Sequence, residues 1–139
     1  MKVLVVDSGG RGHAIAWQFK NDPNVKEVIC APGNAGIARE IRCENARTNE
    51  EIRELAKREK VDLTFVGPES PLTNGIVDLF DAEKMPIVGP RKKASILEGS
   101  QAYTKLLCRE IGVPVAEVAV FDDADNAKDY IESVDYPVV

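Results

Sequence analysis

A glycine-rich turn directly after the first apolar run contains the residues best suited to bind an anion. The run Lys2–Val6 leads into Asp7–His13, where three glycines surround Arg11. Glycine lets the backbone turn tightly and approach a ligand, and the first amides of a following helix are free to bind an anion. Arg11 adds a planar guanidinium that suits phosphate. The turn predicts phosphate contact, although the same glycines also suit an ordinary corner between strand and helix.

A dinucleotide site is the obvious competitor, and the glycine spacing argues against it. That site needs G-x-G-x-x-G and an acidic residue that closes the second strand, where it binds the ribose hydroxyls. Here the glycines are Gly9, Gly10 and Gly12, and the second apolar run ends at 30–32 without a carboxylate. NAD binding is therefore not expected.

Two further loops follow apolar runs at the same relative place as the glycine turn. They are Pro32-Gly33-Asn34 and Gly67-Pro68-Glu69. Because the carboxyl ends of parallel strands meet at one edge of a sheet, we expect the three loops to lie close together. Glu69 stands between two prolines, so we expect a stiff loop whose carboxylate accepts hydrogen bonds from sugar hydroxyls. The alternative for Glu69 is a solvated loop acid.

The elements that must position these loops alternate between short apolar runs and helical stretches. This alternation predicts an α/β fold with an open parallel sheet flanked by helices. Thr48 and Glu51 form a capping-box pair that opens one helix. The expected strands are 2–6, 25–30, a weak one near 40–43, 61–66 and 86–88, and the expected helices are 11–21, one from Thr48, and one that carries Leu72, Ile76, Leu79 and Phe80.

The pattern changes after a brief basic helix at 91–97. Ser100 is expected to cap a helix with an inner face of Tyr103, Leu106, Leu107 and Ile111, followed by a strand at 117–121 and a final helix capped by Asp122. The chain ends in an apolar strand at 136–139 without a stop signal. We therefore expect two units, 1–97 and 98–139, the second cut in mid-strand and poorly packed by itself.

Composition narrows the classes of partner. The 139 residues carry a formal net charge of -5, which favours neither nucleic acid nor an anionic membrane, and no run approaches the length of about 20 residues that a membrane span needs. Three cysteines without a C-x-x-C pair fit a reducing cytoplasm. His13 is the only histidine, so a multi-histidine metal site is excluded, and we interpret it as a capping or packing group.

Five blocks in order along the chain resemble the glycinamide ribonucleotide synthetases, also called phosphoribosylamine–glycine ligases, which are ATP-grasp enzymes of purine biosynthesis. Each block is weakly specific alone, and together they are highly specific. The blocks are the opening strand with Ser8-Gly9-Gly10-Arg11, the loop Ala31–Gly36, the segment Asp62–Leu72, the run Gly75–Asp78, and Gly89-Pro90 with Leu97–Ser100 and Lys105.

The resemblance implies a reaction in which ATP activates the glycine carboxylate as an acyl phosphate, and the amine of 5-phosphoribosylamine attacks it to give glycinamide ribonucleotide, ADP and phosphate. It implies a pre-ATP-grasp domain at 1–97 and the start of the ATP-grasp domain at 98–139. ATP and Mg would bind the full-length enzyme, with Gln101 and Lys105 near the nucleotide. The implied substrate-binding residues are Ser8, Gly9, Gly10, Arg11, Pro32, Gly33, Asn34, Gly67, Pro68 and Glu69, with the ribose phosphate at the glycine turn and the ribose hydroxyls at Glu69.

The chain departs from the family pattern at three positions. Asp7 stands where the family begins its turn with glycine, Gly12 replaces a glutamate, and Gln101 replaces a lysine. A carboxylate near a phosphate costs binding unless it points away or is neutralised. No residue here resembles the catalytic residues of the ligase, which would lie in the remaining ATP-grasp and C-terminal domains. The chain alone is therefore expected to be inactive, and the alternative is a free-standing phosphosugar-binding or interaction module that has lost catalysis.

Overall fold

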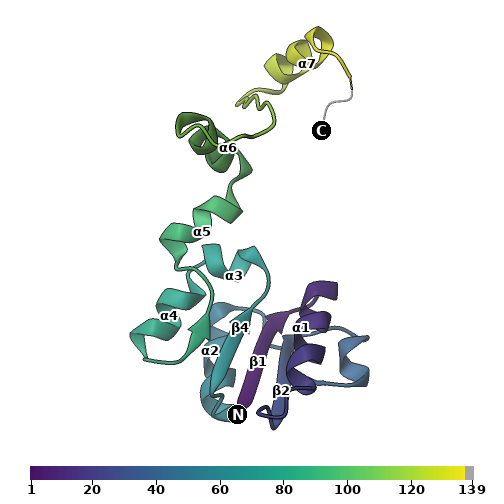
Figure 1. Ribbon diagram of the computed structural model, residues 1–139, viewed down its shortest axis with the longest axis vertical. Helices are drawn as coiled ribbons and strands as arrows, with labels where there is room; N and C mark the ends of the chain where they lie inside the picture. Colours follow the sequence, from purple (N-terminus) through teal and green to yellow (C-terminus); the bar gives the residue numbers. More distant parts are fainter. Residues whose placement is uncertain (137–139) are drawn as a thin grey trace. The chain divides into compact units, whose positions relative to one another are not determined.

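The computed structural model describes residues 1–136 and divides the chain into two compact units, Met1–Gly99 and Ser100–Val139. The first unit contains the sheet (Figure 1). The apolar strand expected at the end of the chain falls mainly on 137–139, which lie outside the described residues.

The first unit is built on a five-stranded parallel sheet in the order β3-β2-β1-β4-β5. The open parallel sheet expected from the sequence is confirmed. Every neighbouring pair is parallel, so all five strands end at the same edge of the sheet. The strands are β1 (Lys2–Asp7), β2 (Glu27–Pro32), β3 (Arg42–Cys43), β4 (Leu63–Val66) and β5 (Ile87–Val88).

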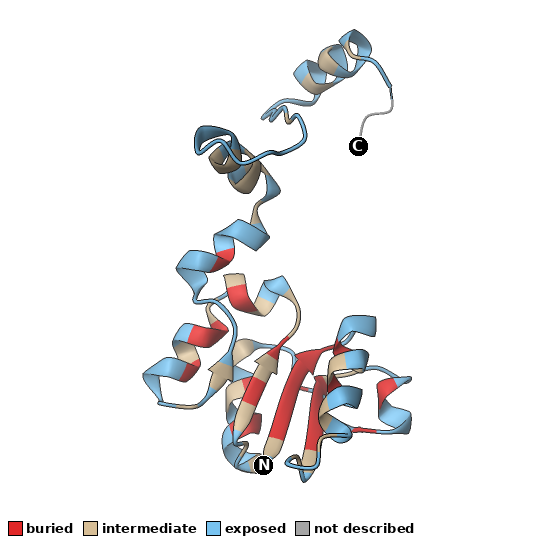
Figure 2. Cartoon of the chain, viewed as in Figure 1, coloured by how far each residue is buried: buried red, intermediate tan, exposed pale blue. Residues whose placement is uncertain are grey.

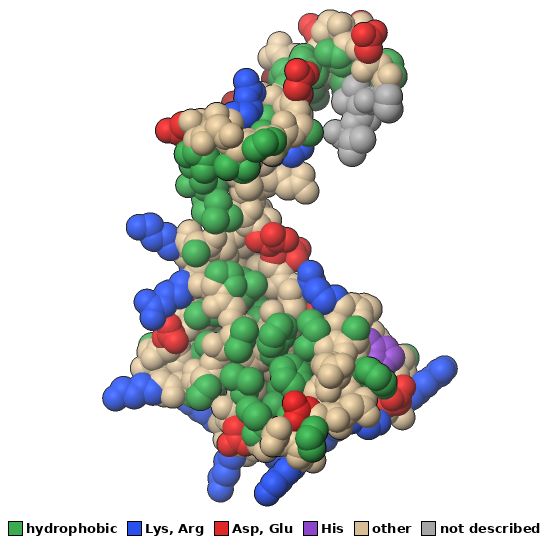
Figure 3. Space-filling model, viewed as in Figure 1, with side chains coloured by type: hydrophobic (Ala, Val, Ile, Leu, Met, Phe, Trp, Pro, Cys, Tyr) green, Lys and Arg blue, Asp and Glu red, His purple; other side chains and the backbone are tan. Residues whose placement is uncertain are grey.

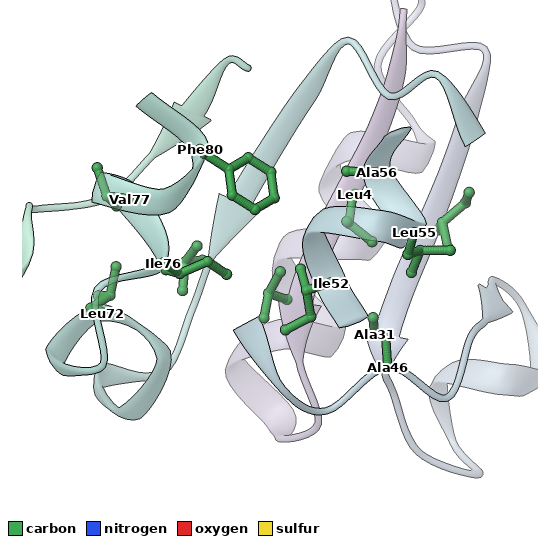
Figure 4. Close-up of a cluster of buried hydrophobic side chains, with 13 residues drawn as sticks. Leu4, Ala31, Ala46, Ile52, Leu55, Ala56, Leu72, Ile76, Val77 and Phe80 are labelled. Carbon is green, nitrogen blue, oxygen red and sulfur yellow. The ribbon is translucent and has the colours of Figure 1, made fainter. Parts of the chain in front are cut away.

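Strand β1 is central because its side chains are apolar on both faces. Val3, Leu4, Val5 and Val6 are all buried, as a strand covered on both sides requires. Two hydrophobic clusters result (Figure 2). Leu4 and Val6 pack with α2 (Asn49–Glu59) and α4 (Ile76–Ala82) on one face (Figure 4), whereas Val3 and Val5 pack with α1 (Gly10–Lys20) and the short 3₁₀ helix η1 (Ile37–Arg39) on the other.

One helix differs from the sequence prediction, and the start of another confirms it. The expected single helix from Leu72 to Phe80 is two helices, α3 (Glu69–Thr73) and α4, because Gly75 between them adopts a φ of 88°. That left-handed conformation is open to glycine and interrupts the helical backbone. The capping box at α2 is confirmed: the Thr48 hydroxyl accepts a hydrogen bond from the Glu51 amide, and the Glu51 carboxylate accepts one from the Thr48 amide.

The second unit contains helices without a buried core. Its helices are α6 (Gln101–Glu110) and α7 (Ala124–Ser133), and neither has a buried residue among those the structure describes (Figure 2). The helix before this unit in the chain, α5 (Lys92–Gly99), is the last helix of the first unit. Ser100 caps α6 as expected. Leu106 is 51% exposed and Ile111 is 62% exposed, so within residues 1–136 the expected inner face of α6 is not buried by any other element.

Two predictions for this unit are wrong. Residues 117–121 form no strand, because no neighbouring strand in the described part of the unit is available to pair with them. The cap of α7 is Asp123 rather than Asp122: its carboxylate accepts hydrogen bonds from the amides of Asp125 and Asn126. Hydrophobic side chains gather on the surface of the unit (Figure 3).

None of the helices within residues 1–136 combines the length and apolar character that crossing a membrane requires.

An ion-pair network ties the amino ends of the strands to the end of α2. Lys2 and Arg42, which begin β1 and β3, both contact the Glu59 carboxylate, at 3.5 Å and 2.8 Å. Lys2 also contacts Glu27 at 2.9 Å, and Arg42 contacts Glu44 at 2.6 Å. The hydrogen bond from Arg42 is the largest cause that lowers the pKa of Glu59. The charge of Arg42 and the hydrogen bond and charge of Lys2 lower the pKa further, against the opposing effect of partial desolvation.

We expect Glu59→Gln to lower stability at neutral pH and to lose this effect in acid. A carboxylate with a lowered folded-state pKa contributes stability above its unfolded pKa, near 4.5, and loses it as the pH falls through the folded value. Urea unfolding at steps from pH 7 to pH 3 measures the difference between variant and parent. Glu98→Gln, at an exposed site without an ion pair in the described structure, should show no such pH dependence. A difference that is constant with pH would contradict the role of the network.

We expect the amides of 117–121 to exchange with solvent much faster than those of β1. The β1 amides are held in a buried parallel ladder, whereas 117–121 have no ladder partner in the described chain. Hydrogen exchange followed by NMR measures both segments in one sample. Equal protection would mean that the second unit is packed as firmly as the first.

Candidate functional site

The three loops expected to converge do meet at the carboxyl edge of the sheet. In the register of the sheet, Val6 pairs with Ala31 on one side and with Val66 on the other. The Gly33 amide donates to the Asp7 carbonyl at 3.0 Å, and the Gly67 amide donates to the Val6 carbonyl at 3.0 Å. Backbone pairing on both sides of β1 therefore fixes where the second and third loops start.

The glycine turn presents the start of α1 at this edge. Gly9 is the N-cap, and the helix begins at Gly10. Among the described residues, the amides of Gly10 and Arg11 have no hydrogen-bond acceptor, as expected for the first turn of a helix. They are the groups that a bound anion would use. The Arg11 side chain is 56% exposed beside them and can reach the same ligand.

Asp7 lies under this turn, and its carboxylate faces inward. One oxygen, Oδ1, accepts hydrogen bonds from the amides of Ser8 at 2.6 Å and Gly9 at 2.7 Å. The other, Oδ2, is 3.5 Å from Nε of Arg11, and it is buried without a hydrogen-bond partner in the part of the chain that the structure describes. The Asp7 side chain is only 6% exposed. Its charge is thus buried beside the anion-binding amides and paired with Arg11.

Two glycines provide the space that Asp7 fills. A Cβ atom at Gly12 would overlap with Cβ and Cγ of Asp7, and a Cβ atom at Gly67 would overlap with its Oδ2. The glycine in α1 and the glycine after β4 therefore serve close packing around one buried carboxylate. The departures at Asp7 and Gly12 are physically linked, because the first side chain occupies the volume that a second one would need.

Asn34 fastens the second loop to the glycine turn. Its Nδ2 donates to the Ser8 carbonyl at 2.7 Å, and its Oδ1 accepts from the amides of Gly36 at 2.7 Å and Ile37 at 2.9 Å. These contacts use the side chain on both its donor and its acceptor side. Asn34 therefore mainly holds the two loops together. The sequence pattern did not predict this structural role.

The cysteines near this loop are packing groups. Cys30 is fully buried in β2 and donates a hydrogen bond to the Asp7 carbonyl at 3.3 Å. Burial is the largest cause that raises the pKa of its thiol to about 12. Burial also raises the pKa of the Cys43 thiol, which packs near Gly33. Neither sulfur provides a ready thiolate nucleophile at neutral pH.

The third loop differs from the expected stiff coil. Pro68 is the N-cap of α3, and Glu69 is the first residue of that helix. The Glu69 side chain is exposed and has no ion pair or hydrogen bond within residues 1–136, so its carboxylate is available to a ligand. The two prolines frame a helix start instead of a loop, because the first turn of a helix needs no backbone N–H donors.

A hollow of about 350 Å³ lies between the start of α2 and helix α3, and the sequence analysis missed it. The Asn49 side chain donates to the Pro71 carbonyl at 3.2 Å and joins the two elements. Ser70, one of the residues that line the hollow, directly follows Glu69 in the sequence. No sequence signal marked this contact, because the two elements are more than 20 residues apart. The hollow is lined by Arg47, Thr48, Asn49, Glu50, Ser70, Pro71 and Asn74.

Gln101 and Lys105 belong to the second unit. They lie in the first two turns of α6, four residues apart, so they share one side of that helix. Within residues 1–136 there is no group of three or more His, Cys, Asp or Glu side chains that could hold a metal ion.

An open parallel α/β sheet with three loops gathered at its carboxyl edge defines a class of ligand-binding domain. Comparisons with known proteins narrow this class. Residues 1–98 match the family described as "Phosphoribosylglycinamide synthetase, N domain". The chain belongs to that family, as the motifs in its sequence indicated.

Relatives and solved structures agree with this membership. A phosphoribosylamine–glycine ligase of Clostridium acetobutylicum is 42% identical over the whole chain, which covers 34% of that ligase. The crystal structure of a phosphoribosylamine–glycine ligase from Thermotoga maritima superimposes with a TM-score of 0.67 at 25% identity, covering 97% of this chain and 31% of that one. The chain thus spans about a third of the length of the curated relatives it matches.

A more distant structure shows the same fold. The biotin carboxylase domain of Hydrogenobacter thermophilus 2-oxoglutarate carboxylase, solved with MgADP, ADP and bicarbonate, superimposes with a TM-score of 0.65 at 18% identity. It covers 98% of this chain, and this chain covers 33% of it. The likeness at this identity concerns the fold alone.

We expect Gly12→Ala to destabilise the protein in the parent background and to stabilise it in an Asp7→Gly background. In the parent, the new methyl overlaps with Asp7 and must displace it. Once Asp7 is gone, alanine should gain about 1 kcal/mol over glycine inside a helix. Urea unfolding of the parent, both single variants and the double variant measures this reversal of sign. If alanine had the same effect in both backgrounds, the two positions would not share one packing site.

Proposed function

We propose that this chain is the N-terminal substrate-binding part of an ATP-dependent ligase that joins glycine to 5-phosphoribosylamine. The products would be glycinamide ribonucleotide, ADP and phosphate in purine biosynthesis. The observation that carries the proposal is the family match over residues 1–98, combined with relatives that are phosphoribosylamine–glycine ligases along the whole chain. The three free cysteines suit a reducing cytoplasm.

The convergence of the three loops supports a phosphosugar site in the first unit. The ribose phosphate would bind the free amides of Gly10 and Arg11 together with the Arg11 guanidinium. The exposed carboxylate of Glu69 would accept hydrogen bonds from the ribose hydroxyls. The remaining predicted residues would shape the surface around these groups, namely Ser8, Gly9, Pro32, Gly33, Asn34, Gly67 and Pro68.

The nucleotide side of the proposal rests on the second unit. Lys105 on α6 would supply a cation for ATP phosphates, and Gln101 one turn earlier would supply an amide donor. Magnesium needs carboxylate oxygens, which residues 1–136 do not offer as a cluster. The Mg ligands and the catalytic residues would therefore come from the remaining ATP-grasp and C-terminal domains, and the chain by itself would be inactive.

We expect a hybrid ligase to be active when this chain replaces the matching third of the Clostridium acetobutylicum enzyme. The whole chain aligns with that third at 42% identity, so we expect it to preserve the contacts with the other domains of the hybrid. The assay is ADP release that depends on both glycine and 5-phosphoribosylamine. In the hybrid, Glu69→Gln should raise the KM for 5-phosphoribosylamine with little effect on the KM for ATP.

The matched control for that substitution is Glu40→Gln in the same hybrid, since Glu40 is also exposed but pairs with Lys20 at the end of α1, whereas the glycine turn lies at the start of that helix. A folded hybrid that binds ATP but ignores 5-phosphoribosylamine would contradict the proposal. It would favour the second form of the alternative, a free-standing interaction module that has lost catalysis, in keeping with the departures from the family pattern at Asp7 and Gln101. Continuation of the reading frame past Val139 into an ATP-grasp sequence would favour the ligase.

A further inference from the structure

The Asp7 carboxylate occupies part of the anion site formed by the glycine turn. Its Oδ1 accepts from the amides of Ser8 and Gly9, which are two of the backbone donors available before α1 begins. Its Oδ2 is buried between Gly67 and Arg11: a Cβ atom at Gly67 would overlap with it, Arg11 Nε is 3.5 Å away, and it has no hydrogen bond in the described structure. A carboxylate held in this way presents to the turn the same kind of charged oxygens that a phosphate would present.

We propose that Asp7 is a specificity-determining residue that acts as an internal anion and weakens the binding of phosphorylated ligands at the glycine turn. The inference rests on the proposed function, because it takes the turn as the phosphate side of the site. A ligand phosphate must use the amides of Gly10 and Arg11, since those of Ser8 and Gly9 are already bound to Asp7. It must also share the Arg11 guanidinium with a buried carboxylate.

The surrounding residues hold Asp7 in this position. Overlap with a Cβ at Gly12 or Gly67 shows that the cavity for the carboxylate closely matches its size. The backbone of Asp7 is fixed as well, because its carbonyl accepts from the Gly33 amide at 3.0 Å. A ligand could move the carboxylate aside only by displacing α1 or the segment after β4, which pack against it, so we expect it to stay beside a bound ligand.

The size of the effect follows from charge. A like charge about 6 Å from a phosphate, at the effective dielectric constant of a protein surface, weakens binding on the order of 100-fold. The ion pair with Arg11 offsets part of this repulsion, which leaves a penalty of roughly tenfold. Neutral sugars should feel almost none of it. The site in this chain would therefore favour weakly charged sugar ligands more than a turn without the carboxylate would.

The test is an NMR titration of the parent chain, Asp7→Asn and Asp7→Gly with ribose 5-phosphate, and with ribose as the uncharged comparison ligand. Asp7→Asn removes the charge and keeps an oxygen for the amides, so ribose 5-phosphate should bind roughly tenfold tighter, with shifts at Gly10 and Arg11. Asp7→Gly also frees the amides of Ser8 and Gly9, so binding should tighten further, and these two amides should join the shifts.

Asp62→Asn is the matched control. Asp62 also accepts a backbone amide, that of Lys2 at 2.6 Å, but it lies at the opposite edge of the sheet, so its loss should leave ribose 5-phosphate binding unchanged. If the parent and Asp7→Asn bound ribose 5-phosphate equally, with shifts at the turn, the proposed role of Asp7 would be wrong. The proposed phosphate site would still be supported. If no folded variant showed shifts at the turn, the proposed phosphate site would be wrong as well. Asp7→Asn decides the question even if Asp7→Gly fails to fold.

Discussion

The parallel pairing of β1 with β2 and β4 is the constraint on which the rest of the first unit depends. Four apolar residues in succession bury β1 on both faces, so the strand can only be central, with a neighbour on each side. The register then fixes three chain segments at one edge, because each loop starts where its strand leaves the ladder. The site thus follows from the hydrophobic core, and its geometry is set by backbone hydrogen bonds before any polar side chain contributes.

Asp7 shows how one residue can belong to both the core and the site. A buried carboxylate without compensation costs several kcal/mol, and here two backbone amides and the Arg11 guanidinium provide that compensation. The same contacts reduce what the turn can offer to a ligand. Gly12 and Gly67 fit this arrangement because the space of their missing side chains is filled by Asp7. The stability of the turn and its affinity for anions are therefore opposed at one residue.

Short-range patterns in the sequence, namely capping pairs and the spacing of apolar residues, predicted most of the fold. The capping box of α2 was readable because Thr48 and Glu51 act on each other within one turn. The strand expected at 117–121 was wrong because a strand needs a partner, which residue pattern alone does not supply. Within the site, the convergence of the loops followed from topology, whereas the inward turn of Asp7 and the joint made by Asn34 depend on side-chain packing between elements distant in sequence.

On the proposed function, the first unit would bind and position a ligand, and other residues would carry out the ligation. Its buried thiol at Cys30 has a raised pKa, and the only histidine of the sequence, drawn in purple in Figure 3, is the fourth residue of α1, where its side chain makes no ion pair or hydrogen bond within residues 1–136. Amides and one guanidinium at a sheet edge can hold a phosphosugar, because these groups act through fixed dipoles and charge. In the proposed ligase, activation of a carboxylate by ATP would demand cations and metal-binding oxygens, which residues outside this unit would supply.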